Sequence, residues 1–484
     1  MPDITVSART GAPQETAADT RVVPLFEGEQ LGEAHLQELV SLGEAKPGLR
    51  KVALEHEEAP GGGRRRVLIA GLGKREELDA EKARVAGAAV AGRAKELGAV
   101  SLSWEAVPGV EAALVEGTLL ALYSFDRFKT AKKDDDSDAS SGIESLEIAG
   151  PEVNEAAVTR GRVTAVAQNA ARDLQNLPAN VADPEFLAGR AQEIAESHDS
   201  LELEIFDREA ITARGMGAFA AVAQGTYTEP RMIVLRYRGA ENGPHLGFVG
   251  KAVTFDTGGI SLKPGAKMSE MKFDMSGGAA VLEAMSAIAT LGLPVTITAV
   301  VPATENMPSG RSVKPGDIVT AMNGKTIEVN NTDAEGRLIL ADALAYAVEQ
   351  GVERIVDLAT LTGAIIVALG STHAGLFSND DAWYSEVEAA CTATGELGWR
   401  LPLHPEYADI VKGKYADLDN APEGRKASSI TAAEFLKHFV GDVPWVHIDI
   451  AGTAWDGGRS YVGKGASGFG VRTLVELAER SGAD

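Results

Sequence analysis

The chain has 484 residues, 44% of them hydrophobic, which is enough to build large cores in more than one domain. Its 70 acidic and 46 basic side chains give a formal charge of −24, so its surface should repel the phosphates of nucleic acids. The sequence contains no run of about 18 uninterrupted apolar residues, and we therefore expect neither a membrane nor a nucleic acid as a partner.

The N-terminal part of the chain predicts a small α/β domain. Residues 1–20 are polar, with no basic start and no apolar centre, and we expect them to be disordered rather than a targeting segment. From residue 21 onward, strand-like segments such as 66–72 alternate with helix-like segments such as 80–97. The acidic and serine-containing run 132–142 is too poor in apolar groups to pack. It predicts an exposed loop near the end of a domain that covers 21–150.

A larger domain is expected to follow. A helical pattern over 151–175 should connect the first domain to the second, which covers 176–484. Apolar runs rich in β-branched residues recur there, with helical patterns between several of them, as is typical of parallel strands covered by helices. The expected fold class is therefore α/β, with a mixed, mostly parallel sheet flanked by helices. The apolar runs lie at 232–237, 246–249, 295–301, 355–358 and 446–450.

The first of two chemically notable segments begins directly after the apolar run 246–249. It contains Lys251, Asp256 and, further on, Asp274. Asp256 and Asp274 lie in apolar surroundings, where ionised carboxylates are seldom buried without a partner. The adjacent glycines at 258 and 259 would let the backbone approach a bound ion or substrate, because they lack a Cβ atom.

The second segment reads Asn-Thr-Asp-Ala-Glu-Gly-Arg-Leu over 331–338. We expect an extended strand tip, in which Asp333, Glu335 and Arg337 project to the same side of the backbone. Two carboxylates held a few Å apart in a low-dielectric cleft repel each other strongly, so they need a cation to neutralise them. Together the two segments predict an oxygen-rich metal site.

These segments resemble those of the leucyl (cytosol) aminopeptidases, the M17 metallopeptidase family. The eight residues at 331–338 match the family motif without a mismatch. The resemblance covers most of the chain from about residue 165 onward, and it implies a macro-like N-terminal domain and a homohexamer. The other matching segments lie at 249–264, 303–310, 357–364 and 447–455.

The resemblance implies two adjacent divalent metal ions per subunit. Manganese and zinc are the expected ions, and magnesium and cobalt also suit such ligands. Lysine binds a metal only as the neutral amine, so neighbouring cations would have to lower the pKa of Lys251 far below its usual value of about 10.4. The implied ligands are Lys251, Asp256, Asp274 and Glu335 for the tighter site, and Asp256, Asp333 and Glu335 for a readily exchanged site.

The resemblance also implies the reaction. The substrate would be a peptide with a free N-terminus, from which a water molecule bridging the two metals removes a residue that is preferentially large and apolar. Lys263 would stabilise the resulting gem-diolate, and Arg337 would hold a bicarbonate ion that acts as the general base. The implied substrate-binding residues are Met271, Thr360, Gly363 and Ala451 in the pocket, with Leu361 at the substrate backbone.

Two alternatives stay open at this point. A two-metal phosphoesterase uses similar carboxylates, but such sites usually include histidines, and neither segment contains one. A DNA-binding or scaffold relative without activity would be marked by loss of a ligand or of Lys263, and all of these residues are present. The single cysteine, Cys391, allows no internal disulfide, so we expect a cytoplasmic protein.

Overall fold

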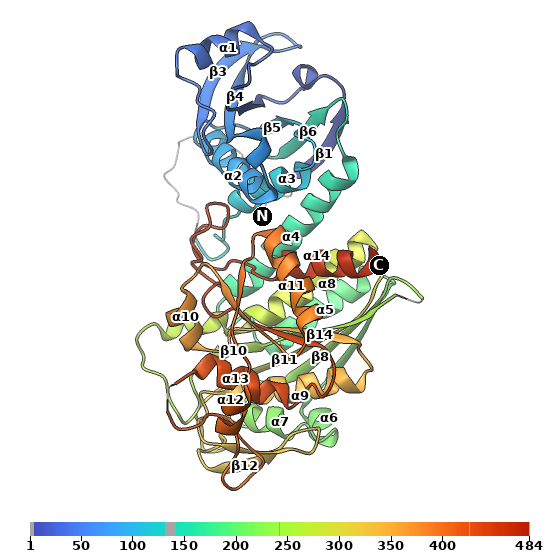
Figure 1. Ribbon diagram of the computed structural model, residues 1–484, viewed down its shortest axis with the longest axis vertical. Coiled ribbons are helices and arrows are strands. Elements are labelled where there is room, and N and C mark those ends of the chain that lie inside the picture. Colours follow the sequence, from blue (N-terminus) through green and yellow to red (C-terminus); the bar gives the residue numbers. More distant parts are fainter. Residues whose placement is uncertain (1–3, 131–141, 242, 425, 484) are drawn as a thin grey trace. The chain divides into compact units, whose positions relative to one another are not determined.

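The computed structural model describes residues 4–130, 142–241, 243–424 and 426–483, which form two compact units (Figure 1). The first unit contains the described residues up to Asn169 together with Arg459–Gly463, and the second contains the others. Helix α4 (Glu155–Asn176) runs across the division. The predicted acidic loop falls almost entirely on 131–141, outside the described residues. Among the described helices, none is both long enough and apolar enough to cross a bilayer.

The first unit is built on a six-stranded sheet in the order β1-β6-β5-β2-β4-β3. All neighbouring strands are parallel except β3 and β4. Helices α2 and α3 pack against each other, and their apolar residues share a core with Leu68 and Trp104 of the sheet. The elements are β1 (Thr5–Thr10), β2 (Thr20–Phe26), α1 (Ala34–Ser41), β3 (Val52–Glu58), β4 (Arg64–Gly73), α2 (Ala80–Glu96), β5 (Ser101–Glu105), α3 (Glu111–Ala121) and β6 (Ser145–Gly150).

The expected disorder of residues 1–20 was wrong for the segment 5–10. This segment forms β1, which pairs in parallel with β6 over its whole length, and Arg9 Nε lies 2.9 Å from Glu147 Oε2 of that strand. The segment is polar because it forms the edge of the sheet, where one row of side chains faces solvent. Its pairing partner lies about 140 residues later in the chain, so local composition could not reveal it.

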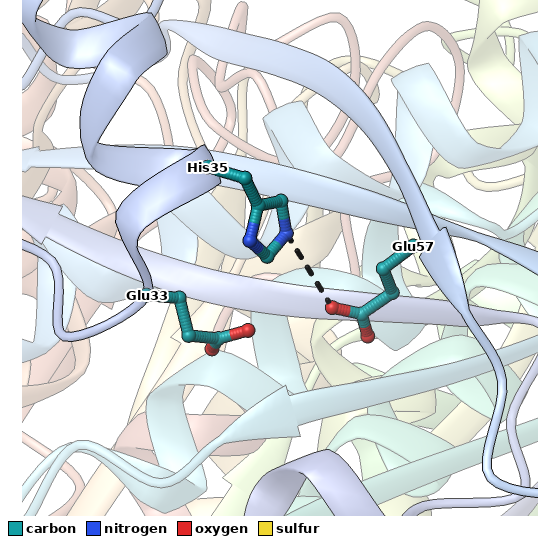
Figure 2. Close-up of side chains that lie close together, drawn as sticks. All are labelled: Glu33, His35 and Glu57. Carbon is teal, nitrogen blue, oxygen red and sulfur yellow. Dashed lines mark ion pairs between the residues drawn. The ribbon is translucent and has the colours of Figure 1, made fainter.

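A buried arginine of β2, Arg21, neutralises an acidic cluster in the first unit. Its Nη2 lies 2.7 Å from Glu33 Oε2 and 2.8 Å from Glu57 Oε2, and its Nη1 lies 2.7 Å from Glu105 Oε1. His35 Nε2 also approaches Glu57, at 3.9 Å, so one histidine and two glutamates converge as in a metal site (Figure 2). Since the guanidinium already bridges both carboxylates and has no lone pair to offer, we assign the cluster a stabilising role.

The second unit contains a nine-stranded mixed sheet, and the predicted α/β class is confirmed. Its main path runs β16-β15-β18-β14-β9-β11-β8-β7, and β10 pairs with β11. The central strands β18, β14, β9 and β11 are parallel, and β7 and β8 run antiparallel to their neighbours in this path. Strand β15 is antiparallel to β18 and parallel to β16. The strands are β7 (Leu201–Phe206), β8 (Arg231–Arg238), β9 (His245–Gly250), β10 (Ala252–Asp256), β11 (Thr296–Asn306), β14 (Arg354–Ala359), β15 (Ala374–Ser378), β16 (Gly398–Arg400) and β18 (Trp445–Asp449).

Helices pack against this sheet, and a small second sheet completes the unit. Helices α8 and α9 are largely buried and contact the central strands β9 and β11. The small sheet has the order β12-β13-β17, with β12 (Asp317–Thr320), β13 (Thr326–Val329) and β17 (Leu418–Asp419). The helices are α5 (Pro184–Glu196), α6 (Arg208–Ala213), α7 (Gly217–Ala223), η3 (Met268–Met275), α8 (Ser276–Leu291), α9 (Glu335–Glu349), α10 (Gly363–Leu369), α11 (Asp381–Thr394), α12 (Pro405–Ile410), α13 (Ser428–Lys437) and α14 (Val471–Ala483).

The carboxyl ends of the parallel strands β10, β11, β14 and β18 lead into the motif segments. Asp256 ends β10, and the segment that starts at Thr360 follows β14 directly. Ala451 comes two residues after the end of β18. This is the edge at which open α/β sheets place their ligand crevices, so the topology brings the predicted site residues together.

Candidate metal centre and active site

The predicted ligand residues Lys251, Asp274 and Glu335 form a buried cluster in the second unit. The Nζ atom of Lys251 lies 2.7 Å from Asp274 Oδ2 and 2.8 Å from Glu335 Oε1. It also donates a hydrogen bond to the carbonyl oxygen of Thr360 at 3.2 Å. Thr360 in turn donates from Oγ1 to Asp274 Oδ1 at 2.7 Å. Each polar end is thereby fixed by a partner from another element.

The remaining predicted ligands, Asp256 and Asp333, meet at the second lysine. Lys263 Nζ lies 2.6 Å from Asp256 Oδ2 and also contacts Asp333 Oδ1. The carboxylates of Asp256, Asp333 and Glu335 each offer an oxygen atom within 4.8 Å of the others. These are the three residues that the resemblance assigns to the readily exchanged metal site.

The segment that carries Asp333 and Glu335 is a turn followed by a helix, and the predicted extended strand tip was wrong. Asp333 lies in the turn, where its N–H donates to Asn331 Oδ1 at 2.9 Å, and Glu335 is the first residue of α9. A carboxylate in the first turn of a helix is favoured by the helix dipole, and asparagine side chains stabilise such turns. The two carboxylates therefore converge through a turn rather than through strand alternation.

Gly258 and Gly259 permit a close approach, but the groups that come close belong to the protein. Both have positive φ angles, 86° and 64°. A Cβ atom on Gly258 would lie 2.5 Å from the Ser261 carbonyl oxygen and 2.8 Å from Asp333 Oδ1. A Cβ atom on Gly259 would lie 2.8 Å from Asn306 Oδ1. The glycines thus let the loop after β10 pack against the turn that carries Asp333.

Burial and like charges raise the pKa values of three carboxyls in the cluster. Burial, followed by the charge of Glu335, raises the pKa of Asp333 to about 6. Burial also raises the pKa of Asp256, and it raises the pKa of Asp274 well above its ordinary value. Burial acts against the charge of Glu335 as well, but Lys251 and the second lysine outweigh it and lower the pKa of this glutamate.

The protein groups alone keep Lys251 charged. Burial lowers its pKa, but Asp274, Glu335 and Asp256 outweigh burial and raise it above the ordinary value. A metal ligand requires a lowered lysine pKa, and the protein groups alone therefore do not give Lys251 such a pKa. Divalent cations would have to displace the ammonium proton, because metal binding and deprotonation are coupled.

The cluster fits divalent cations. Four carboxylates face two ammonium groups, so two negative charges are in excess when all four carboxylates are ionised, as metal ligands must be. Asp274 Oδ2 is buried beside Lys251 and accepts no well-oriented hydrogen bond. Carboxylate oxygens and an amine that can give up its proton are the donors that such ions take. In the acidic cluster of the first unit, by contrast, the central cation is the guanidinium of Arg21, which cannot become a metal ligand.

A pocket of about 400 Å³ opens onto the cluster. Beyond the cluster residues, Trp455 and Ile366 also line it, and the indole of Trp455 stacks on Phe273 with ring centroids 5.3 Å apart. The wall beside the carboxylates is therefore largely apolar. All five predicted substrate-binding residues line this pocket: Met271, Thr360, Leu361, Gly363 and Ala451.

Arg337 lies in an adjoining pocket of about 720 Å³, which shares Asp333 and Leu361 with the first one. Its Nη1 donates to the carbonyl oxygen of Asn420. Its Nε is buried and has no hydrogen-bond partner among the described residues. Burial lowers the pKa of the guanidinium, although the neighbouring carboxylates, Glu335 first, oppose the shift. A buried donor without a partner is costly, so this position favours an anion.

Two further residues support the site and were not singled out in the sequence. Asn306, at the end of β11, donates from Nδ2 to Asp256 Oδ1 at 2.8 Å. Asp449, at the end of β18, is fully buried and accepts from the N–H of Leu361 at 3.1 Å and from Thr362 Oγ1 at 2.6 Å. Asp449 interrupts an apolar run, and this was the available signal, because carboxylates in such runs are seldom unpaired.

A substitution of Gly336, in the first turn of α9, tests how closely Lys251 is packed. A Cβ atom there would lie 2.7 Å from Lys251 Nζ and 2.8 Å from its Cε. Gly336→Ala should therefore displace the lysine and lower kcat by about 100-fold, the cost of a misplacement near 1 Å. Because the clash is with a buried, ion-paired side chain, the substitution should also lower the free energy of unfolding by about 1 to 3 kcal/mol, which outweighs the gain of about 0.5 to 1 kcal/mol from alanine in a helix.

Steady-state kinetics and thermal melting measure the two effects of this substitution. Gly189→Ala is the matched control, because Gly189 lies in α5 with no atom within 4 Å of its added Cβ. Unchanged kcat in Gly336→Ala would show that the position of Lys251 is not critical.

Comparison of the sequence with protein-family profiles gives two matches. Residues 169–475 match the profile described as cytosol aminopeptidase family, catalytic domain. Residues 22–132 match the profile described as cytosol aminopeptidase family, N-terminal domain. The first match covers most of the second unit, and the second match covers much of the first unit.

Known proteins similar to the chain include two from bacteria. A "probable cytosol aminopeptidase" of Solibacter usitatus is 48% identical over 95% of this chain and 96% of its own length. A protein of the same name from Roseiflexus castenholzii is 44% identical over 97% of this chain and 98% of its own length. Among solved structures, the bottromycin maturation enzyme BotP superposes with a TM-score of 0.85 at 34% identity, covering 97% of this chain and 100% of that one. A second BotP structure, a complex with Mn, has a TM-score of 0.84 at 34% identity and covers 96% and 99%.

Proposed function

Because the chain belongs to the cytosol aminopeptidase (M17) family of metal-dependent exopeptidases, we propose that it removes large apolar residues from free peptide N-termini at the carboxylate cluster. The observation that carries this proposal is the convergence of four carboxylates, three of them buried, and two lysines beside a pocket with an apolar wall. Peptides are the substrates that the family implies.

We propose that two divalent ions bind per chain. Lys251, Asp256, Asp274 and Glu335 would hold one, and Asp256, Asp333 and Glu335 the other. When bound, such ions polarise the scissile carbonyl and lower the pKa of water enough to supply a nucleophile at neutral pH. The Mn complex of BotP makes manganese a reasonable first choice.

Lys263 is proposed to stabilise the negative charge that develops on the carbonyl oxygen. Asp256 and Asp333 hold its ammonium group at the mouth of the cluster, and the side chain is 22% exposed, so it can reach a bound substrate. Burial lowers its pKa, but Asp256 and Glu335 outweigh burial and raise it, so the group stays protonated and can donate. A fixed donor aimed at developing charge is an effective catalytic device.

The pocket is proposed to bind the first residue of the peptide. Met271, Ala451 and the aromatic wall of Trp455 offer apolar surface to its side chain. Selectivity should be broad, because one methylene in such a pocket is worth about 1 to 3 kcal/mol. The N–H of Leu361 is already bonded to Asp449, so the carbonyl of Leu361 is the group that would contact the substrate backbone. An internal peptide nitrogen would lose the contact that a free amine makes with a metal, which favours exopeptidase action.

Arg337 is proposed to hold a bicarbonate ion that serves as general base. Wild-type turnover of leucine amide should rise with added bicarbonate, whereas Arg337→Ala should be insensitive to it and about 100-fold slower, as expected for loss of a general base. Both effects are measured by amide hydrolysis in bicarbonate-depleted and bicarbonate-supplemented buffer. Arg311→Ala, at an exposed position in the same unit, is the control. Indifference to bicarbonate in both wild type and Arg337→Ala would remove the assignment.

A paired assay tests the proposed function against its alternatives. The protein should hydrolyse leucine p-nitroanilide after loading with Mn²⁺, lose this activity with a chelator, and leave p-nitrophenyl phosphate untouched. Hydrolysis of the phosphate ester alone would indicate a phosphoesterase. Inactivity on both substrates in metal-loaded protein would favour a scaffold or DNA-binding role. Histidine is absent from the lining of the pocket in the described part of the chain, which favours the peptidase.

We also propose a homohexamer in the cytoplasm. Several large apolar side chains of the second unit are exposed, including Val367 at 90% and Tyr415 at 75%, and exposed apolar surface favours association. The solution mass should be six times the 50.6 kDa of the chain, and a monomeric mass by light scattering would contradict this. The cytoplasmic location is supported by the printed name of the relatives and by the buried Cys391.

A further inference from the structure

Asn420 joins the turn that carries Asp333 to a distant part of the chain. It follows β17 directly, is fully buried, and lies about 90 residues after the turn in sequence. Its N–H donates to the carbonyl oxygen of Glu328 in β13 at 3.0 Å. The small sheet therefore fixes the backbone of Asn420 independently of the contacts that its side chain makes.

The side chain of Asn420 uses all of its hydrogen-bonding capacity on the turn. Its Oδ1 accepts from the N–H of Asn330 at 2.9 Å and from that of Asn331 at 3.3 Å. Its Nδ2 donates to the carbonyls of Asn331 at 2.8 Å and Ala334 at 3.4 Å. Exchanging the amide oxygen and nitrogen would place donors against donors, so the network itself fixes the orientation. Aspartate, with no donor, could make only half of these bonds.

The same residue also holds Arg337, because the carbonyl oxygen of Asn420 accepts from its Nη1. Asn420 is thus bonded on both sides of Asp333 along the chain and to the arginine of the adjoining pocket. The Asp333 side chain is 33% exposed, against 10% or less for the other three carboxylates, so packing fixes its position least. Apart from the contact of its carboxylate with Lys263, the position of Asp333 is therefore set by how its backbone is anchored.

We propose that Asn420 is a positioning residue that sets Asp333 and Arg337 for metal binding and catalysis. This inference rests on the proposed function. Its removal should leave the apolar pocket intact, because Met271, Thr360 and Ala451 lie on other segments. Partners that orient the ligands of a metal typically contribute about 10- to 100-fold in metal affinity or activity.

The substitution Asn420→Ala should lower kcat for leucine p-nitroanilide by about 10- to 100-fold while KM changes little. The affinity for the more weakly bound Mn²⁺ should fall by a similar factor, measured by the electron paramagnetic resonance of free Mn²⁺ during titration. Adding Asn420→Ala to Arg337→Ala should lower kcat by a smaller factor than Asn420→Ala does in the wild type. The reason is that the effects of residues in one hydrogen-bond network are not additive.

Asn379→Ala is the matched control. The Asn379 side chain also bridges backbone groups of the second unit, accepting from Trp445 N at 2.8 Å and donating to Val443 O at 3.0 Å. It should lower the melting temperature without changing kcat or Mn²⁺ affinity. Equal losses of kcat in both variants would overturn the proposal, because they would reflect stability alone.

Other outcomes separate this proposal from the proposed function. A metal-loaded wild type without aminopeptidase activity would contradict the proposed function, and the Mn²⁺ titration would still test Asn420. Wild-type kcat and Mn²⁺ affinity in Asn420→Ala would overturn the positioning role. If Asn420→Ala does not fold, Asn420→Asp keeps the volume and both accepted bonds, and it should show the same losses.

Discussion

The substitution Lys251→Arg should remove one of the two proposed metal ions and lower kcat by about 100-fold or more, since even residues behind the ligands contribute about 10- to 100-fold. A guanidinium keeps the positive charge but has no lone pair to give to a metal. The site also lacks room for a larger group, because Lys251 is buried and packs against Gly336. Metal analysis after gel filtration and steady-state kinetics measure the two losses.

Lys314→Arg is the control for this substitution, because Lys314 is exposed and pairs with nearby Asp317 in the same unit. It should keep both metal content and kcat. Full metal content and normal turnover in Lys251→Arg would show that Lys251 is a counter-ion of the carboxylates rather than a ligand.

The substitution Lys263→Met should lower kcat by about 10²- to 10³-fold, as loss of a donor to developing negative charge does in other hydrolases. Mn²⁺ affinity should stay the same or rise, because the change removes a positive charge 2.6 Å from Asp256. The roles of the two lysines can therefore be distinguished. Replacing Lys251 should cause loss of bound metal, whereas replacing Lys263 should lower kcat. Kinetics combined with Mn²⁺ titration provide the comparison.

Lys412→Met, at an exposed lysine that pairs with Asp409, controls for the loss of one lysine from the surface. A Lys263→Met protein that lost its metal together with its activity would contradict the assignment. Such a result would place Lys263 among the groups that hold the ions.

The clustering of the candidate ligands could be predicted from sequence because these residues lie in two short segments. Lys251, Asp256 and Asp274 come from one of them, and Asp333 and Glu335 from the other. Strand topology then brings the segments together at one edge of the sheet. The turn geometry of 331–335 was predicted incorrectly, because the spacing of two carboxylates suits both a strand and a helix start.

The supporting residues were harder to predict, because their hydrogen bonds and ion pairs join residues that lie far apart in the sequence. Asn420 is bonded to residues about 90 positions earlier. Asp449 lies inside an apolar run and is bonded to Leu361 and Thr362, nearly 90 positions earlier. Arg21 joins glutamates from three separate segments. Such partners are brought together only by tertiary structure.

Crystals grown with Mn²⁺ and measured at the manganese absorption edge test the central claim most directly. Two anomalous peaks should appear between Asp256 and Glu335, one of them within bonding distance of Lys251 and Asp274 and the other near Asp333. Absence of both peaks from these side chains in an active preparation, or a peak only at Glu33, His35 and Glu57, would contradict the account.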